Sequence, residues 1–431
     1  MNKTFLIWAI TLFLPFSLSF GQKNGEPQET SPVQTTPLNF GNRHVFHSKI
    51  LNESRSMDIY LPETYHDASS DHVYPVIVVL ESEFFHVTTG IVKHLSSVSR
   101  MPEAIVVAFS GESEGFYAPS IYTNKSNNWP SDWEKLEFSG PAKMYVDFFS
   151  KELFPYLAKN YRTAKFRMIV GSSARAAFVL HAFAKEPALF QAHIAISAGD
   201  ILGMGYQPGQ CFNDLFVESM TRTPNRKGYL YVASSDSDVD YAPEIGTNLV
   251  DLEKRLSPFR SKNLRFKSEV IPNETHYGSY LKAFTTAMEV FFPIGKWAPE
   301  FQEFEKPPGP AIDKMDSFYK KLSADYGFSI LPKAEKWNSG NSVKAGGRRL
   351  LRAERYEEAI QYFKRLVQYR PRSASALKSL ADAYEAHQNL EQAIITGEKA
   401  VALAKRHDKK NLTLYEDNLK KLKGKLEESK K

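Results

Sequence analysis

Short apolar runs alternate with amphipathic stretches along the first two-thirds of the chain. Each run has the length of a β-strand, and a helical pattern follows most of them; the runs are residues 74–80, 104–109, 166–170, 193–197, 229–233 and 265–271. Strands that alternate with helices in this way are typical of a mostly parallel sheet with helices on both faces. Residues 43–61 precede them with the pattern of a β-hairpin. We therefore predict an α/β domain over residues 39–295.

The pattern becomes helical towards the C-terminus. After a connecting segment (residues 296–335), the sequence Tyr356-Glu-Glu-Ala-Ile recurs as Leu390-Glu-Gln-Ala-Ile, 34 positions later. This period resembles the tetratricopeptide repeat and predicts an all-α region over residues 336–431, with residues 412–426 as a capping helix. Two repeats are few for a free-standing array, so we expect this region to dock on the α/β domain or on a second subunit, or to bind a protein partner.

The N-terminus has the pattern of an export signal. Residues 1–21 combine an early lysine, an apolar run and small residues, with Ser19 and Gly21 placed as at a signal-peptidase site. The mature chain would begin at Gln22, and residues 22–38 would form a linker. The alternative is a retained membrane anchor, because the apolar run approaches spanning length. We expect an exported protein, periplasmic or secreted, with membrane contact only if the signal is retained.

Composition and charge exclude several other classes of protein. The formal net charge of +6 is small for 431 residues and gives no nucleic-acid footprint. The single cysteine, Cys211, excludes an intrachain disulfide framework and the multi-cysteine zinc patterns. The sequence implies no metal and no organic cofactor.

A candidate nucleophile follows the strand predicted at residues 166–170. The strand leads into Gly171-Ser172-Ser173-Ala174-Arg175, and a helix comes next. This is the context of a nucleophile elbow, a strained turn that lifts a serine above the carboxyl end of a central strand. Small residues are needed two positions before and after that serine; Gly171 meets the first need, and Arg175 stands where a second glycine is usual.

Candidate acid and base residues follow later strands, in the chain order that this kind of site requires. His276 follows the last predicted strand and would accept the proton of Ser173. The loop after residues 229–233 is rich in carboxylates that could orient the histidine. We favour Asp236, followed by Asp238, and then Asp240 or Glu274.

An oxyanion hole would need two backbone N–H groups near Ser173. One would come from Ala174, directly after the serine. The other would come from Glu81 or Ser82, which follow the strand at residues 74–80.

These motifs resemble the putative-esterase branch of the α/β-hydrolases, which includes the enterochelin (siderophore) esterases and esterase D-type enzymes. The resemblance covers about residues 43–292 and is carried by residues 74–80, 85–92, 101–107, 156–163 and 274–279. It implies that Ser173 is the nucleophile and His276 the base of a carboxylic ester hydrolase acting on a small-molecule ester, without a cofactor. Two different functions are also compatible with the sequence: acyl transfer on the same fold, and a catalytically impaired ligand-binding or scaffold protein that uses the repeats as its contact surface.

Two positions depart from the family pattern. Leu80-Glu81-Ser82 stands for Leu-Asp-Gly, and Arg175 stands for the second glycine of the elbow. Either Arg175 binds a carboxylate of the substrate, since guanidinium groups pair with carboxylates bidentately, or the elbow has relaxed and binds ligand without turnover. A large gain of hydrolysis in Arg175→Gly would indicate the relaxed elbow.

Overall fold

The computed structural model describes residues 38, 40–110, 142–203, 211–260, 263–335 and 340–430. The signal peptide predicted at residues 1–21 and almost all of the linker predicted at residues 22–38 lie outside this part of the chain. None of the helices in the described residues is both long enough and apolar enough to cross a bilayer.

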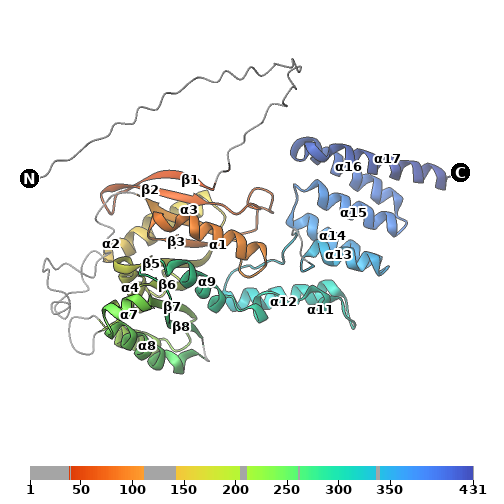
Figure 1. Ribbon diagram of the computed structural model, residues 1–431. Helices are drawn as coiled ribbons and strands as arrows, with labels where there is room; N and C mark the ends of the chain where they lie inside the picture. The colour runs from red at the N-terminus through yellow and green to blue at the C-terminus, as the bar shows by residue number, and fades with distance from the viewer. Residues whose placement is uncertain are drawn as a thin grey trace, which may run out of the picture. The chain divides into compact units, whose positions relative to one another are not determined.

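An eight-stranded sheet forms the centre of the first domain, in the order β1-β2-β4-β3-β5-β6-β7-β8 (Figure 1). The hairpin strands β1 and β2 are antiparallel to each other, and β2 is antiparallel to β4, whereas the remaining pairs are parallel. The strands are β1 (Asn42–Ser48), β2 (Glu53–Tyr60), β3 (Tyr74–Val79), β4 (Ile105–Ser110), β5 (Thr163–Ser172), β6 (Ala192–Ile196), β7 (Gly228–Ser235) and β8 (Leu264–Ile271). The predicted mostly parallel α/β sheet, including its hairpin, is confirmed.

Helices cover both faces of this sheet because successive strand residues point in opposite directions. In β3, Val76 and Val78 belong to one apolar core, and Ile77 and Val79 belong to the other. The first core holds α2 (Ala142–Asp147), a π-helical segment (Phe148–Leu153), α3 (Phe154–Asn160), α4 (Ala176–Lys185), α5 (Gly199–Leu202), α6 (Phe212–Arg222) and α8 (Glu244–Arg260). The second holds α1 (Phe85–Ser97), α9 (Tyr280–Phe291) and α10 (Ile294–Trp297).

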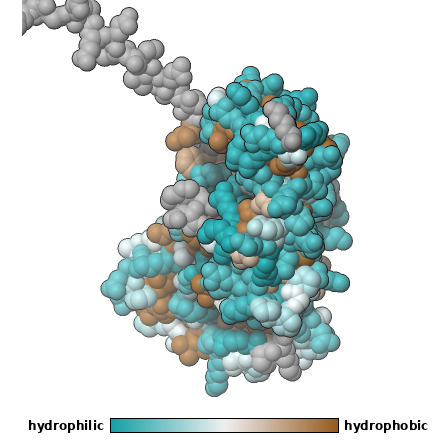
Figure 2. Space-filling view, turned by 90° about the vertical axis from the view of Figure 1, so that its right-hand side faces the viewer, coloured by the Kyte–Doolittle hydropathy of each residue, from teal (hydrophilic) through white to brown (hydrophobic). Residues whose placement is uncertain are grey.

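The C-terminal region consists of antiparallel helices whose starts follow the repeat seen in the sequence. Helices α14 and α16 begin at Tyr356 and Leu390, the two positions that are 34 residues apart. The helices are α13 (Val343–Arg352), α14 (Tyr356–Tyr369), α15 (Ala374–Ala386), α16 (Leu390–His407) and the capping helix α17 (Leu412–Ser429). On the face shown in Figure 2 polar residues predominate and apolar residues lie in small separate groups, as is usual for a solvated surface.

Helix α12 (Ala311–Tyr326) joins the two regions. Its first half, with Ala311 and Met315, packs with α11 (Phe301–Glu305) in the core of the repeat helices. Its last turns, with Leu322 and Tyr326, pack in the second core of the sheet domain. The N–H of Ser69 also donates to the carbonyl of Tyr369 at 3.2 Å, so the expected docking of the repeats on the α/β domain is confirmed.

Close packing between α13 and α14 yields a test of the repeat core. A Cβ at Gly347 would lie 2.8 Å from the Cε1 atom of Phe363, a ring that is 1% exposed. Gly347→Ala is therefore expected to destabilise the protein by about 1–3 kcal/mol, despite the better helix propensity of alanine. The control, Gly424→Ala in α17, meets no described atom within 4 Å and should stabilise by about 0.5–1 kcal/mol. Urea unfolding followed by circular dichroism measures both, and equal effects would contradict the packing argument.

Candidate active site

The chain makes a strained turn where β5 ends. Ser173 has a φ of +52°, in the left-handed region that residues other than glycine rarely adopt. A short 3-10 turn (Ser173–Arg175) follows, and α4 begins at once. A Cβ at Gly171 would lie 2.8 Å from the carbonyl oxygen of Arg175, so this close approach requires a glycine. The strained strand–turn–helix geometry expected of a nucleophile elbow is present at Ser173.

Arg175 fits this turn without distortion. Its backbone has φ −76° and ψ −20°, ordinary helical values that any residue adopts, so the conformation does not demand glycine here. The side chain is 17% exposed and lies against the same pocket as Ser173. The side chain of Arg175 therefore points into the pocket and not out to solvent.

A pocket of about 400 Å³ opens over the turn. Its lining consists of Glu81, Glu83, Phe84, Ser172, Ser173, Ala174, Arg175 and Tyr277. Phe84 stacks on the ring of Tyr280 with 3.8 Å between centroids, and Tyr277 lies beside it at 6.5 Å. The pocket therefore combines one aromatic wall with a serine hydroxyl and the ionisable side chains of Glu81, Glu83 and Arg175.

His276 lies in the loop between β8 and α9 and is fixed through its ring and its backbone. Its Nδ1 atom is 2.7 Å from Oδ1 of Asp238, and its carbonyl oxygen accepts hydrogen bonds from the hydroxyls of Ser197 (2.6 Å) and Ser279 (2.9 Å). Ser197 directly follows β6, whose last residue, Ile196, pairs with Ser172 at the end of β5. The hydroxyl that anchors His276 thus comes from the strand next to the one that carries Ser173.

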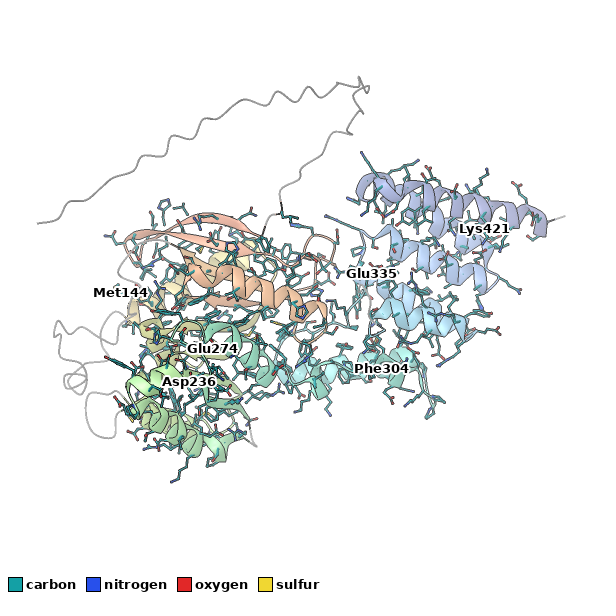
Figure 3. The ribbon with its side chains drawn as sticks, in the orientation of Figure 1. Met144, Asp236, Glu274, Phe304, Glu335 and Lys421 are labelled. Atoms are coloured by element: carbon teal, nitrogen blue, oxygen red, sulfur yellow. The ribbon has the colours of Figure 1, made fainter. Side chains whose placement is uncertain are left out.

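Asp236 does not partner His276, and our preference for it as the orienting acid is wrong. Its carboxylate accepts the backbone N–H groups of Asn273 (2.6 Å) and Glu274 (3.1 Å), and these bonds lower the pKa of Asp236. Figure 3 shows Asp236 and Glu274 on neighbouring segments. Asp236 therefore holds the backbone of the loop that carries His276.

Asp238, the second choice from the sequence, occupies the orienting position because the acidic segment is helical. Helix α7 (Asp236–Tyr241) begins with a capping box in which Ser235 and Asp238 each bind the other's backbone N–H. The second oxygen of Asp238 accepts the N–H of Ser235 at 3.0 Å, which leaves the first oxygen for His276. Glu274 instead forms an ion pair with Lys282, and Asp240 is exposed to solvent.

A third acid at this edge, Asp200, was not predicted from the sequence. Burial raises the pKa of Asp200, and Asp200 interacts electrostatically with His276 and Asp238. Asp200 follows the end of β6, the same edge of the sheet that supplies the other site residues. Its position after a parallel strand is the signal that could have identified it.

Glu81 connects β3 to the elbow. One oxygen of its carboxyl group, Oε1, accepts the backbone N–H of Ser172 at 2.9 Å and lies 3.8 Å from Nη1 of Arg175. Burial raises the pKa of Glu81 to about 8, although Arg175 acts to lower it. Of the expected oxyanion residues, Glu81 and Ala174 line the pocket, and Ser82 begins the adjacent 3-10 turn (Ser82–Phe84).

The described residues contain no group of three or more His, Cys, Asp or Glu side chains arranged to hold a metal ion. The chemistry that this arrangement can support uses the hydroxyl of Ser173, the ring of His276 and the carboxylate of Asp238.

Comparisons with known proteins agree with the fold. Residues 48–209 match the family model described as a putative esterase, and residues 344–407 match a tetratricopeptide-repeat model. A search of curated proteins gives no match.

Two solved structures share the fold at low sequence identity. An IroE-like serine hydrolase from Shewanella oneidensis is 20% identical with a TM-score of 0.56, over 76% of this chain and 97% of that one. An uncharacterised protein from Capnocytophaga ochracea DSM 7271 is 17% identical with a TM-score of 0.51, over 89% of this chain and 99% of that one. Over residues 48–209 the chain is thus similar to the putative esterases, and this match supports a carboxylic ester hydrolase with tetratricopeptide repeats at its C-terminal end.

Proposed function

We propose that the protein hydrolyses carboxylic esters with a catalytic triad of Ser173, His276 and Asp238. The observation that carries the proposal is the 2.7 Å hydrogen bond between His276 and Asp238, at the same sheet edge as a serine with a φ of +52°. A backbone that had relaxed would have no reason to keep a serine in this conformation. The strain therefore supports turnover over a binding-only role.

The proposed reaction follows from the roles of these groups. Asp238 accepts a hydrogen bond from the protonated Nδ1 of His276, which leaves Nε2 free to take the proton of the Ser173 hydroxyl. The serine oxygen attacks the ester carbonyl, and the resulting oxyanion is stabilised by the N–H of Ala174 and one from Glu81 or Ser82. His276 then protonates the departing alcohol. Water, deprotonated by His276, cleaves the acyl–serine bond and releases the acid.

The substrate proposed for this site is a small ester, and an aryl or acylated group would fit its aromatic wall. The rings of Phe84 and Tyr277 form that wall beside Ser173, and the buried ring of Tyr280 stacks on Phe84. A siderophore ester, as the family resemblance implies, is one member of this class. We also propose export, on the sequence of residues 1–21.

Covalent labelling tests both proposals in one experiment. A fluorophosphonate probe applied to the exported fraction of the native host should modify Ser173 and no longer do so in His276→Ala, because the hydroxyl needs the base. Ser172→Ala is the matched control: this neighbouring serine is 2% exposed and should not affect labelling. The intact mass of the labelled chain should correspond to a start at Gln22. Labelling of a serine other than Ser173 would refute the proposed triad. Stable ester binding without any labelling of the protein would refute it as well.

A further inference from the structure

Glu81 and Arg175, the two residues that depart from the family pattern, lie next to each other in the structure. Glu81 follows β3, and Arg175 follows the elbow serine by two positions, 94 positions further along the chain. Their charged groups approach to 3.8 Å at the inner side of the pocket, where Glu81 is 5% exposed. In so dry a place the attraction between two charges is much stronger than in water. Arg175 therefore favours the ionised form of Glu81.

The same carboxyl group also holds the backbone of the elbow. Oε1 of Glu81 accepts the N–H of Ser172, the residue directly before the strained serine. This bond fixes the peptide group between Gly171 and Ser172, one residue before the strained serine, and so restrains the backbone at the start of the turn. Any charge that acts on Glu81 also acts on this bond, because an ionised acceptor binds an N–H more strongly than a neutral one.

The groups around Glu81 act in opposing directions. Burial is the largest influence and raises the pKa of Glu81 to about 8, while Arg175 and the N–H of Ser172 lower it and the charge of Glu83 raises it. Tyr280 also interacts electrostatically with Glu81, and its hydroxyl forms a 2.8 Å hydrogen bond with the hydroxyl of Thr88. Arg175 is the cation among these groups, so it is what allows Glu81 to ionise at moderately alkaline pH.

We propose that Glu81 and Arg175 form a coupled pair of positioning residues that holds the elbow serine in its strained conformation. The inference rests on the proposed function, since it assigns a role in placing Ser173. It makes Arg175 the counter-charge of Glu81 and leaves the recognition of a substrate carboxylate to other groups.

A double-mutant cycle tests the pair. Glu81→Gln, Arg175→Gln and the double variant are compared at pH 9 on a neutral ester, 4-nitrophenyl butyrate. Each single variant is expected to lower kcat by about 10-fold with little change in KM, and the double variant by about 10-fold instead of 100-fold, because it removes both charges. Glu83→Gln combined with Arg175→Gln is the control cycle; Glu83 lines the same pocket but is exposed, and its effects should add.

Dependence on pH separates this role from a merely structural one. At pH 6.5 Glu81 is neutral in the wild type, so the coupling should disappear. In the wild type kcat should rise as Glu81 ionises near pH 8. This step should be absent in Glu81→Gln and should move to higher pH in Arg175→Gln, where the cation that favours ionisation is gone.

Three results would overturn the inference. The first is an additive cycle for Glu81 and Arg175 at pH 9 in a wild type that labels at Ser173; this leaves the proposed function intact. The second is a loss in Arg175→Gln confined to the KM of an anionic ester such as 4-nitrophenyl monoadipate, which would make Arg175 a substrate-binding residue. The third is a wild type that does not label at Ser173 at all, and this result removes the proposed function as well. The midpoint of thermal unfolding of each variant confirms that it is folded.

Discussion

His276→Ala is expected to lower kcat for ester hydrolysis by about 10⁴- to 10⁶-fold. Without the ring, no base is present to take the proton from Ser173, and no acid returns it to the departing alcohol. Ser173→Ala should lower kcat by a similar factor. The double variant should lose no more than either single variant, because the two groups act as one unit.

Steady-state kinetics on a small aryl ester measures this loss, with His94→Ala as the control. His94 is an exposed histidine in the last turn of α1, and its removal should change kcat by less than about 2-fold. If His276→Ala keeps a tenth of the wild-type kcat, the histidine is not the base and another proton acceptor must be found.

Asp238→Asn is the second large effect, expected to lower kcat by about 10³- to 10⁴-fold. An amide in place of the carboxylate no longer stabilises the imidazolium that forms when His276 takes a proton. It can also donate to Nδ1 and so favour the tautomer whose Nε2 carries hydrogen. Because the His276–Asp238 hydrogen bond is 2.7 Å long and the Asp238 side chain is only 12% exposed, water cannot easily take the place of the lost carboxylate.

Asp236→Asn provides a matched comparison, since it makes the same change two residues away. Asparagine keeps one oxygen that can accept the N–H of Asn273 or Glu274, so the loop should stay near its place. We expect kcat to fall by less than about 10-fold, with a lower midpoint of thermal unfolding. The reverse order, a larger kinetic loss in Asp236→Asn, would show that the pairing of His276 with Asp238 does not operate during catalysis.

Local pattern was enough to predict the layers of the fold and the position of the strained turn. The strand at residues 166–170 is largely buried, and Gly171 directly after it allows the close approach to the carbonyl oxygen of Arg175 that the turn requires. The starts of α14 and α16 were likewise readable from the recurrence of Tyr356 and Leu390.

Local sequence pattern could not decide whether Asp236 or Asp238 pairs with His276. The pattern predicts a loop of solvated carboxylates, whereas the segment forms α7, and the helical turn sends each carboxylate in a different direction. Which carboxylate pairs with His276 depends on how the loop after β8 packs against α7. The same holds for Glu81 and Arg175, whose contact joins two strand ends that no spacing in the sequence relates.

The shared helix α12 has a consequence for how the protein can be divided. A truncated chain that stops at residue 295 would lack Leu322, Tyr326 and Phe328, leaving Phe166, Tyr229 and Phe292 open to water. Such a fragment is a poor candidate for expression as a stand-alone enzyme, because α12 and the residues directly after it complete the second core of the sheet domain.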